Sequence, residues 1–498
     1  MALDAAVGDP TDHHEGVPAQ ADDTHDRRWL AFVAVVVVVG FVMRITVMTS
    51  RLGNLDSDEA VVGMTARAML HGHFRAFFWD QDYAGTAETA LAAAVFAVTG
   101  AKVVALKGVA VALSAVSALL VWRVGRRCLD ERTAQVAALL VWIAPTPYIW
   151  FATKTRGFYW VAMVTGLLVL LSAQRIAQEG SRHRDWLVLG LAAGIGWWTS
   201  PTVAYFAVPA ALWLVVQRPS LRRAWPFVPA ALLGASPWLW HNLQTRLSSF
   251  HIAPQPEHTT YARGLGRLLW QVTPMVLDLR RPYFTTWVVG GAAIYLVVAA
   301  AVVVAVVVRK DRPVLVLLGL VTFPWIYASF PGRWFVGEGR YALFLTPFLF
   351  LTLAWLARRR RWQAALVAVL AVLTAFGLHD MRADPARHIG GDVKALEAAG
   401  ADRVWSDYWT SYRLMFESHE KIVSSSGLFQ RSVPLLQVVA NSQHPAWAYP
   451  RTDGRVPLLR DALAKLGVNT RLLQTPNFNV VIADRPVNPE SVPPGLRL

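Results

Sequence analysis

The most constraining feature of this sequence is a series of apolar runs, each close to the ~20 residues that a helix needs to cross a bilayer. About eleven such runs can be delimited along the chain. They lie near 29–49, 103–122, 133–151, 157–174, 186–199, 201–217, 225–243, 287–308, 313–330, 340–357 and 362–378. Pro201 would interrupt a continuous helix through the short pair at 186–217. The runs predict a polytopic α-helical membrane protein with about eleven transmembrane helices.

The composition agrees with a membrane protein. Of 498 residues, 55% are hydrophobic and only 16% are charged, whereas a soluble protein carries about a quarter charged residues. The 22 tryptophans also fit, because indole rings gather at membrane–water interfaces. The first apolar run has no small-residue cleavage site, so we expect it to stay in the membrane. The single cysteine, Cys128, excludes an internal disulfide framework.

The basic residues predict the orientation of the chain. A net charge of +15 raises nucleic acid as a partner, but the basic residues form short clusters between apolar runs, so we exclude nucleic acid. Clusters follow the second, fourth, sixth, eighth and tenth runs, on one side of the membrane. They comprise Arg123, Arg126, Arg127 and Arg132; Arg175, Arg182 and Arg184; Arg218, Arg222 and Arg223; Arg309, Lys310 and Arg312; and residues 358–361. Positive loops stay in the cytoplasm, which predicts a multi-pass protein of the cell (plasma) membrane with its C-terminus outside.

This topology divides the chain into three parts. Residues 1–28 are polar and without periodicity, and are predicted to form a disordered cytoplasmic tail. Residues 29–378 form the transmembrane domain, with a long first outer loop at 50–102. Residues 379–498 are predicted to form a small extracytoplasmic α/β domain, with helices at 392–399 and 456–466 and strands at 403–409, 421–425 and 477–483.

Acidic residues are concentrated in the first outer loop. Asp56, Asp58 and Glu59 lie in the stretch Asn-Leu-Asp-Ser-Asp-Glu, just before an amphipathic helix predicted over 60–70 along the membrane surface. A single Asp before a helix is an ordinary N-cap. Three acids within four positions instead indicate a divalent-cation site or a general base. Glu88 opens a second short apolar helix further along the loop.

Three motifs carry a resemblance to a known family. They are Asp58-Glu59-Ala-Val-Val-Gly, Tyr83-Ala-Gly-Thr-Ala-Glu88 and Gly339-Arg340-Tyr341. With many spans followed by an outer domain, the chain resembles the GT-C superfamily of membrane glycosyltransferases over most of its length. Within that superfamily it looks most like bacterial relatives of the protein mannosyltransferases and of the lipid A aminoarabinose transferase.

The chain departs from these relatives at two motifs. Val61 and Val62 follow the Asp-Glu pair where the mannosyltransferase relatives often carry a His. The Lys-Pro-Pro that the aminoarabinose enzymes have near the second motif is missing. Contacts to the donor phosphate therefore cannot be copied from those enzymes.

The resemblance implies an inverting transfer of a sugar from a polyprenyl-phosphate donor to an outer glycan, lipid or protein acceptor. An attacking hydroxyl needs a base, and the motif assigns that role to Asp58, because the N-terminal dipole of a helix stabilises an ionised carboxylate. Glu59 is assigned a supporting or metal-facing role, and Asp56 a role as helix cap or secondary ligand. The requirement for a divalent cation is left open.

The leaving phosphate needs cations. Arg340 is the first candidate because its planar guanidinium can bind phosphate through two N–H groups. Lys102 and Lys107 are interpreted mainly as side chains that snorkel to the headgroups. The other candidates for the donor site are Tyr341, Tyr83, Glu88, Lys154, Arg156 and Arg333.

In the C-terminal domain, Trp409 and Tyr412 either stack on an acceptor glycan or form core, while Trp405 and Tyr408 are expected in the core. Two other classes of protein are considered, a transporter or flippase and a non-catalytic receptor or assembly factor. Transporters tend to show internal repeats and charged residues within their spans. Here no repeat is visible and the acids gather in one outer loop, which favours the enzyme.

Overall fold

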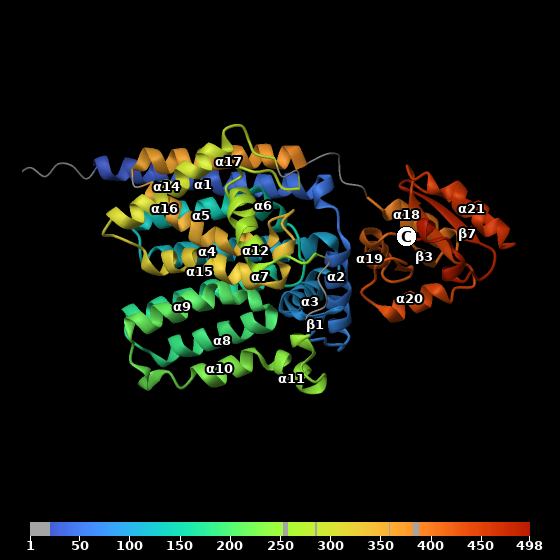
Figure 1. Cartoon of the computed structure of the whole chain (residues 1–498), viewed down its shortest axis with the longest axis horizontal. Helices are drawn as coiled ribbons and strands as arrows, with labels where there is room; N and C mark the ends of the chain where they lie inside the picture. The colour runs from blue at the N-terminus through green and yellow to red at the C-terminus, as the bar shows by residue number, and fades with distance from the viewer. Residues whose placement is uncertain (1–19, 252–256, 284–285, 358, 382–387) are drawn as a thin grey trace, which may run out of the picture.

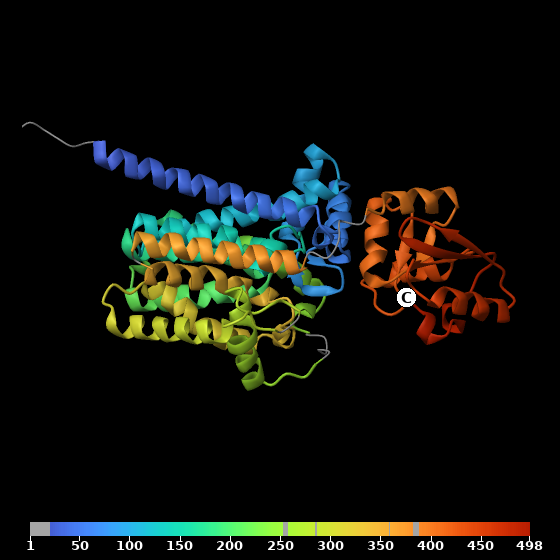
Figure 2. The ribbon, with the colours of Figure 1, turned by 90° about the horizontal axis from the view of Figure 1, so that it is seen from above.

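The computed structural model of the chain describes residues 20–251, 257–283, 286–357, 359–381 and 388–498. A bundle of long helices forms the larger part, and a smaller part with a β-sheet lies beyond one end of it, as two perpendicular views show (Figures 1 and 2).

The helices of the bundle follow the predicted apolar runs. They are α1 Gln20–Met48, α4 Val103–Gly125, α5 Glu131–Ile143, α6 Thr146–Phe151, α7 Tyr159–Gln178, α8 His183–Thr199, α9 Ala204–Gln217, α10 Phe227–Gly234, α11 Ser236–Gln244, α14 Gly291–Val308, α15 Val314–Ser329, α16 Thr346–Leu356 and α17 Arg360–Met381. Pro145 separates α5 from α6, so the run at 133–151 is two helices instead of one. Shorter turns include η2 Pro201–Val203, η4 Ser248–Phe250, α12 Tyr261–Arg267, η5 Leu268–Val272, α13 Thr273–Val276, η6 Pro331–Trp334 and η7 Arg340–Leu345.

Five helices in the described part of the chain are both long and apolar enough to cross a membrane. They are Arg27–Met48, Val103–Gly125, Tyr159–Gln178, Gly291–Val308 and Arg360–Met381. The figure of about eleven spans stays a prediction. The predicted tail is corrected in one respect, because residues 20–28 belong to α1. No Gly or Pro between Gln20 and Arg28 interrupts the helix before its apolar part begins.

The arginine-rich connections lie together at the end of the bundle opposite the sheet (Figure 1). Arg127 is paired with Glu179 across two connections. Nη1 of Arg309 donates to the carbonyl oxygen of Trp355 at 2.7 Å. Successive long helices alternate in direction between the two ends, which is the arrangement that the spacing of the basic clusters predicts.

The first loop forms a layer across the other end. It consists of α2 Ser57–Leu70, the hairpin strands β1 Phe77–Phe78 and β2 Gln81–Gly85, and α3 Ala87–Thr99. Figure 1 shows α2 crosswise to the long helices, between them and the sheet. The predicted surface helix thus starts at Ser57 and is buried over much of its length, because it packs on both α3 and α19. With 13 residues, α3 is too short to span a bilayer.

The C-terminal part is a five-stranded sheet with the order β4-β3-β5-β7-β6. Strands β3 and β4, and β3 and β5, are parallel, while β7 is antiparallel to β5 and β6. Its elements are α18 Gly390–Ala398, β3 Arg403–Trp405, α19 Tyr408–Glu417, β4 Val423–Ser425, α20 Val433–Ala440, β5 Ala446–Pro450, α21 Arg455–Lys465, β6 Thr470–Gln474 and β7 Phe478–Ala483.

The strand predicted at 403–409 is wrong in its second half. It ends at Trp405, and the Asp407 side chain caps α19 by accepting from the backbone N–H of Trp409 at 2.9 Å. This cap turns Tyr408 and Trp409 from strand into helix. As a result, α19 packs on α2, and its first residue reaches the acidic turn of the first loop.

Candidate active site

A reciprocal cap at the start of α2 fixes the three acids in one turn. Oδ1 of Asp56 accepts from the backbone N–H of Glu59 at 3.0 Å, and Oε2 of Glu59 accepts from the N–H of Asp56 at 3.4 Å. This is the arrangement expected when a capping residue is followed three positions later by Glu. The cap directs Asp56 and Glu59 into the bundle, whereas Asp58 lies on the side of the C-terminal domain.

Two lysines surround the carboxylate of Glu59. Nζ of Lys107 donates to both carboxylate oxygens, at 2.9 and 3.0 Å, and Nζ of Lys154 donates to Oε2 at 2.9 Å. All three side chains are buried. Burial of such charges is tolerated only because each faces an opposite charge and further hydrogen bonds. The snorkelling interpretation of Lys107 is therefore wrong, and Glu59 faces two ammonium groups.

A chain of ion pairs continues from Asp56 to Arg340. Oδ2 of Asp56 accepts from Nε and Nη2 of Arg156, at 3.0 and 2.7 Å. Nη1 of Arg156 reaches Glu338 at 3.3 Å, and Glu338 in turn accepts two hydrogen bonds from Arg340, at 2.9 and 3.1 Å. Burial opposes ionisation of Asp56, but Arg156 and Lys154 hold the pKa of its carboxyl well below the usual range.

The carboxylate of Asp58 has different partners. Its Oδ1 accepts from the hydroxyl of Tyr408 at 2.6 Å and from Nη2 of Arg431 at 2.8 Å. Both donors belong to the C-terminal domain. In the described part of the chain nothing donates to Oδ2 of Asp58, and the side chain is 14% exposed. Asp58 is thus the one acid of the α2 turn with a carboxylate oxygen to which none of the described residues donates.

A cavity of about 240 Å³ is bordered by strand β2 of the hairpin. It is lined by aromatic and a few polar residues: Asp82, Tyr83, Trp197, Pro201, Trp238, Ser249, Phe250, His251, Phe330, Pro331, Gly332 and Tyr341. Desolvation, reinforced by the neighbouring Tyr341, raises the pKa of the Tyr83 hydroxyl to about 12. The charges of Asp58 and Arg340 also act on that hydroxyl, so Tyr83 borders both the cavity and the charged cluster.

The charged cluster carries more cations than anions. Its four carboxylates are Asp56, Asp58, Glu59 and Glu338, and its five cations are Lys107, Lys154, Arg156, Arg340 and Arg431. Each cation pairs with at least one of these carboxylates, but the group as a whole carries one more positive than negative charge, which favours an anionic ligand. Among the described residues, no group of three or more His, Cys, Asp or Glu side chains is arranged to hold a metal ion.

Comparison with known proteins supplies the family context. Residues 88–241 match the family model described as dolichyl-phosphate-mannose-protein mannosyltransferase. No curated protein sequence matches the chain. Among solved structures, the apo form of ArnT from Cupriavidus metallidurans is similar, with a TM-score of 0.63 and 14% identity over 91% of this chain and 98% of that one.

The same protein bound to undecaprenyl phosphate matches with a TM-score of 0.60 and 12% identity over the same shares. The archaeal oligosaccharyltransferase AglB from Archaeoglobus fulgidus, in complex with an inhibitory peptide and a dolichol-phosphate, matches with a TM-score of 0.48 and 12% identity. That match covers 85% of this chain and 70% of the other. The chain has the fold of the GT-C glycosyltransferases.

Several residues expected to bind the donor are buried or lie outside the charged cluster. Glu88 is fully buried, and its Oε2 accepts from the backbone N–H of Trp160 at 3.1 Å, which ties α3 to the start of α7. Arg333 donates to the carbonyl oxygens of Thr259 and Phe330 and makes no ion pair with the cluster in the described part of the chain. Lys154 and Arg156 belong to the cluster but are buried against its carboxylates.

The two residues expected to bind the acceptor, Tyr412 and Trp409, differ in their exposure. Tyr412 is fully buried, and its hydroxyl accepts from the backbone N–H of Arg431 at 2.7 Å, so it cannot stack on a glycan. Trp409 is 53% exposed and lies beside Tyr408, with 5.0 Å between ring centroids. Tyr408 itself, expected in the core, has its hydroxyl in the site instead.

Sequence reasoning missed Glu338, Arg431 and the role of Lys107 in the GT-C site. Glu338 had a usable signal, because it directly precedes the Gly-Arg-Tyr motif and an acid beside a candidate phosphate-binding arginine points to a partner. Arg431 had none, since it follows an irregular stretch of the C-terminal domain. Its partner Asp58 is 373 positions away.

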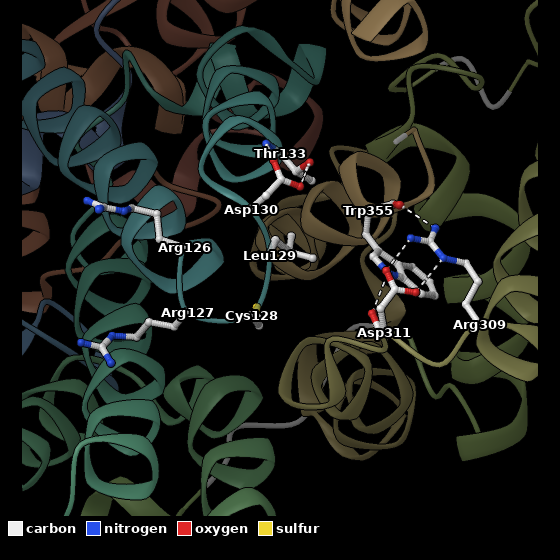
Figure 3. Close-up of a pocket in the computed structure, with 9 residues that line it drawn as sticks. All are labelled: Arg126, Arg127, Cys128, Leu129, Asp130, Thr133, Arg309, Asp311 and Trp355. Atoms are coloured by element: carbon white, nitrogen blue, oxygen red, sulfur yellow. Dashed lines mark hydrogen bonds and ion pairs between the residues drawn. The ribbon is translucent and has the colours of Figure 1, made fainter. Parts of the chain in front are cut away.

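A second hollow lies at the arginine-rich end and has a volume of about 430 Å³. Figure 3 shows Arg126 and Arg127 pointing away from the side formed by Asp311 and Trp355. Arg126 is paired with Glu131, and Arg309 with Asp311, at 2.6 and 2.9 Å. Arg126 and Arg309 are therefore already engaged by carboxylates beside this hollow.

Proposed function

We propose that this protein is an inverting glycosyltransferase that moves a sugar from a polyprenyl-phosphate donor to a hydroxyl of an outer glycan, lipid or protein. The family model and the GT-C fold support glycosyl transfer from such a donor, and the matched ArnT structure holds undecaprenyl phosphate. The observation that carries the proposal is the open Oδ2 of Asp58 at the edge of a cluster with excess positive charge.

Asp58 acts as the general base in this mechanism. The acceptor oxygen forms a bond to the anomeric carbon while the bond from that carbon to the donor phosphate oxygen breaks. The acceptor proton passes to Oδ2 of Asp58, and the bonding electrons leave with the polyprenyl phosphate. Attack from the face opposite the leaving group inverts the anomeric centre. A positioned carboxylate in this role contributes about 10²–10⁴-fold to the rate.

Arg340 stabilises the phosphate that leaves. Its Nε and one N–H of Nη2 are bound to Glu338, so the edge formed by Nη1 and the other N–H of Nη2 stays available in the described structure. That edge can bind two phosphate oxygens. Tyr83 and Tyr341 line the adjacent cavity, where their hydroxyls can donate to the donor phosphate or sugar. The neutral hydroxyl of Tyr83 is kept as a donor by its raised pKa of about 12.

The topology and the acceptor side complete the proposal. The arginine-rich end faces the cytoplasm of the cell membrane, as positive loops do, and the acidic turn with the C-terminal domain faces outward. Trp409, exposed beside Tyr408, offers a ring face on which an acceptor sugar can stack. The acceptor reaches Asp58 from this side.

The decisive test is release of free polyprenyl phosphate by the purified protein in detergent, with a panel of polyprenyl-phosphate sugars. Asp58→Asn should lower turnover by at least about a hundredfold while donor still binds. Asp80→Asn is the matched control in the same loop, because Asp80 is exposed at φ 56, a conformation that Asn also tolerates. Full turnover in Asp58→Asn would refute the assignment of the base. Transport of a lipid-linked substrate without cleavage would favour the flippase instead.

A further inference from the structure

We infer that Arg431, together with Tyr408, is a positioning residue for the transfer reaction, supplied to Asp58 by the C-terminal domain. Nη2 of Arg431 and the hydroxyl of Tyr408 both donate to Oδ1 of Asp58, at 2.8 and 2.6 Å. Nε of Arg431 also donates to the Tyr408 hydroxyl at 2.5 Å. The three groups therefore form a closed triangle in which each contacts the other two. The inference rests on the proposed function of Asp58.

The surroundings of Arg431 hold it in place. Its guanidinium lies over the rings of Phe78, Tyr408 and Phe429, at 5.0, 5.5 and 5.6 Å from their centroids. Its own backbone N–H donates to the hydroxyl of Tyr412. A guanidinium packed on three rings and fixed through its backbone has few alternative positions, so it gives its partner a defined direction.

The two hydrogen bonds to Oδ1 of Asp58 leave its second carboxylate oxygen, Oδ2, for the reaction. Because Oδ1 is engaged by both donors, the carboxylate of Asp58 is held in place, and Oδ2, to which none of the described residues donates, is left to accept a proton. The other groups whose charge acts with or on Asp58 are Arg156, Tyr83 and Tyr341. Among the described residues Arg431 is the only cation hydrogen-bonded to Asp58.

A second arginine crosses the same interface without reaching Asp58. Nη2 of Arg67, on α2, donates to the carbonyl oxygen of Phe416 at 2.8 Å and pairs with Glu420 at 3.2 Å. Ser57 also donates to the carbonyl oxygen of Tyr408. Arg67 thus docks α19 on α2 as Arg431 does, but only Arg431 contacts the base. This difference separates a role in docking from a role in positioning.

The experiment compares Arg431→Gln and Arg431→Lys with Arg67→Gln in the full-length protein in detergent. The first measurement is kcat/KM for the donor as a function of pH. We expect Arg431→Gln to lose roughly 10- to 100-fold in kcat and to change the pH profile of kcat/KM, with partial recovery in Arg431→Lys. Arg67→Gln should keep the wild-type pH profile even where its activity is lower.

The second measurement needs no substrate. Thermal melts of Arg431→Gln, Asp58→Asn and the double variant form a cycle. We expect Arg431→Gln to lower the melting temperature much less when Asp58 is already Asn. Additive melting shifts, or a pH profile that Arg431→Gln and Arg67→Gln leave equally unchanged, would overturn the inference. Full activity of Asp58→Asn would refute the proposed base, whatever the melts show. Absence of turnover by the wild type would refute the proposed function, and with it the role of Arg431.

Discussion

At the scale of single residues, the charges around α2 show how a buried carboxylate is kept. Glu59 has no exposed surface, and its oxygens face the ammonium groups of Lys107 and Lys154. Compared with apolar packing, such a group contributes little to stability, but removal of its charge leaves the partners uncompensated. The network therefore holds the turn that presents Asp58, and its weak point is Glu59.

Replacement of Glu59 by Gln should therefore be strongly destabilising. Lys107 would lose the carboxylate it pairs with, and Lys154 would keep only Asp56, which should cost on the order of 3–5 kcal/mol. Thermal melts in detergent would measure the loss. Glu397→Gln is the control, since Glu397 pairs with Lys421 where both side chains are largely in solvent, and such a pair contributes little. Equal melting temperatures for the two variants would contradict the buried network.

A second prediction compares the kinetics of variants at Arg340 and at Arg333. Arg340→Ala should weaken donor use through both KM and kcat, because the phosphate gains charge as the bond breaks, at a cost on the order of 2–4 kcal/mol. Arg340→Lys should recover only part of this, since the planar fork is lost. Arg333→Ala should keep near-normal kinetics, because Arg333 lies outside the cluster. The opposite ranking would move the phosphate site to Arg333.

The raised pKa of the buried Glu88 carboxyl predicts that the stability of the protein depends on pH. Burial raises the pKa of its carboxyl from 4.5 to about 7, so the folded state binds a proton that the unfolded state releases. The stability from this proton is complete below pH 4.5 and is lost as the pH rises through about 7. Glu88→Gln lacks the titration. The melting temperature of the wild type, relative to that of Glu88→Gln, should therefore fall between pH 5 and pH 8, and a constant difference would contradict this.

The sequence identified part of the site at this scale. Asp58, Glu59 and Arg340 were found because they belong to short motifs, and Lys154 and Arg156 because cations are needed beside a phosphate. The partners of these residues could not be paired in advance, because each contact joins segments that are far apart along the chain. Arg431 and Tyr408 reach Asp58 only through the packing of α19 on α2, which no local pattern encodes.

At the scale of elements, the contact between α2 and α19 depends on a glycine. A Cβ at Gly63 would lie 2.4 Å from the ring of Phe416, which is fully buried and stacks on Phe96. Gly63 thus permits the two helices to approach closely enough for Tyr408 and Arg431 to reach Asp58.

Gly63→Ala should consequently destabilise the protein by about 1–3 kcal/mol, the usual cost of overpacking. It should also increase hydrogen exchange in α19. Gly108→Ala is the matched control, since Gly108 is also helical but a Cβ there meets no atom within 4 Å. The control should be neutral or slightly stabilising, by up to about 1 kcal/mol. Similar behaviour of the two variants would contradict the close contact of α2 and α19.

Element types were easier to predict than their ends. Long apolar runs have only one structure available in a membrane, and each predicted run contains helix. The errors concern α2, α19 and the break between α5 and α6, where a cap or a proline decides the boundary. For α19 the deciding group is the Asp407 side chain, whose effect outweighs the strand preference of the aromatic residues after it.

At the scale of the whole molecule, the orientation can be tested with an impermeant thiol reagent. In a Cys128→Ser background, a cysteine at Lys465, on the exposed part of α21, should react in intact cells. A cysteine at Lys310, in an arginine-rich connection, should react only after permeabilisation. The reverse pattern would invert the topology and remove the outer-face chemistry. Ser424 would be a poor position for such a label, because it is fully buried in β4.

The resemblance to the GT-C glycosyltransferases is confirmed at this scale by the family model and by the ArnT fold. Membrane proteins are favourable for such an inference, since the periodicity of apolar runs and basic clusters limits the number of possible arrangements. The packing of the C-terminal domain on the first loop could not be predicted from the sequence. That arrangement depends on the complementary surfaces of two parts that the sequence shows only separately.

The triangle of Asp58, Tyr408 and Arg431 also has a consequence for the order of events during biosynthesis. Asp58 leaves the ribosome early, with the first helices, whereas Arg431 emerges only when nearly nine-tenths of the 498 residues have been translated. A nascent chain that already contains α1 to α17 can pair Asp56 and Glu59 with their cations, yet its Asp58 has no partner. The proposed base therefore gains its partners in one of the last steps of synthesis, and a chain terminated before α19 would carry the cation cluster with Asp58 unpaired.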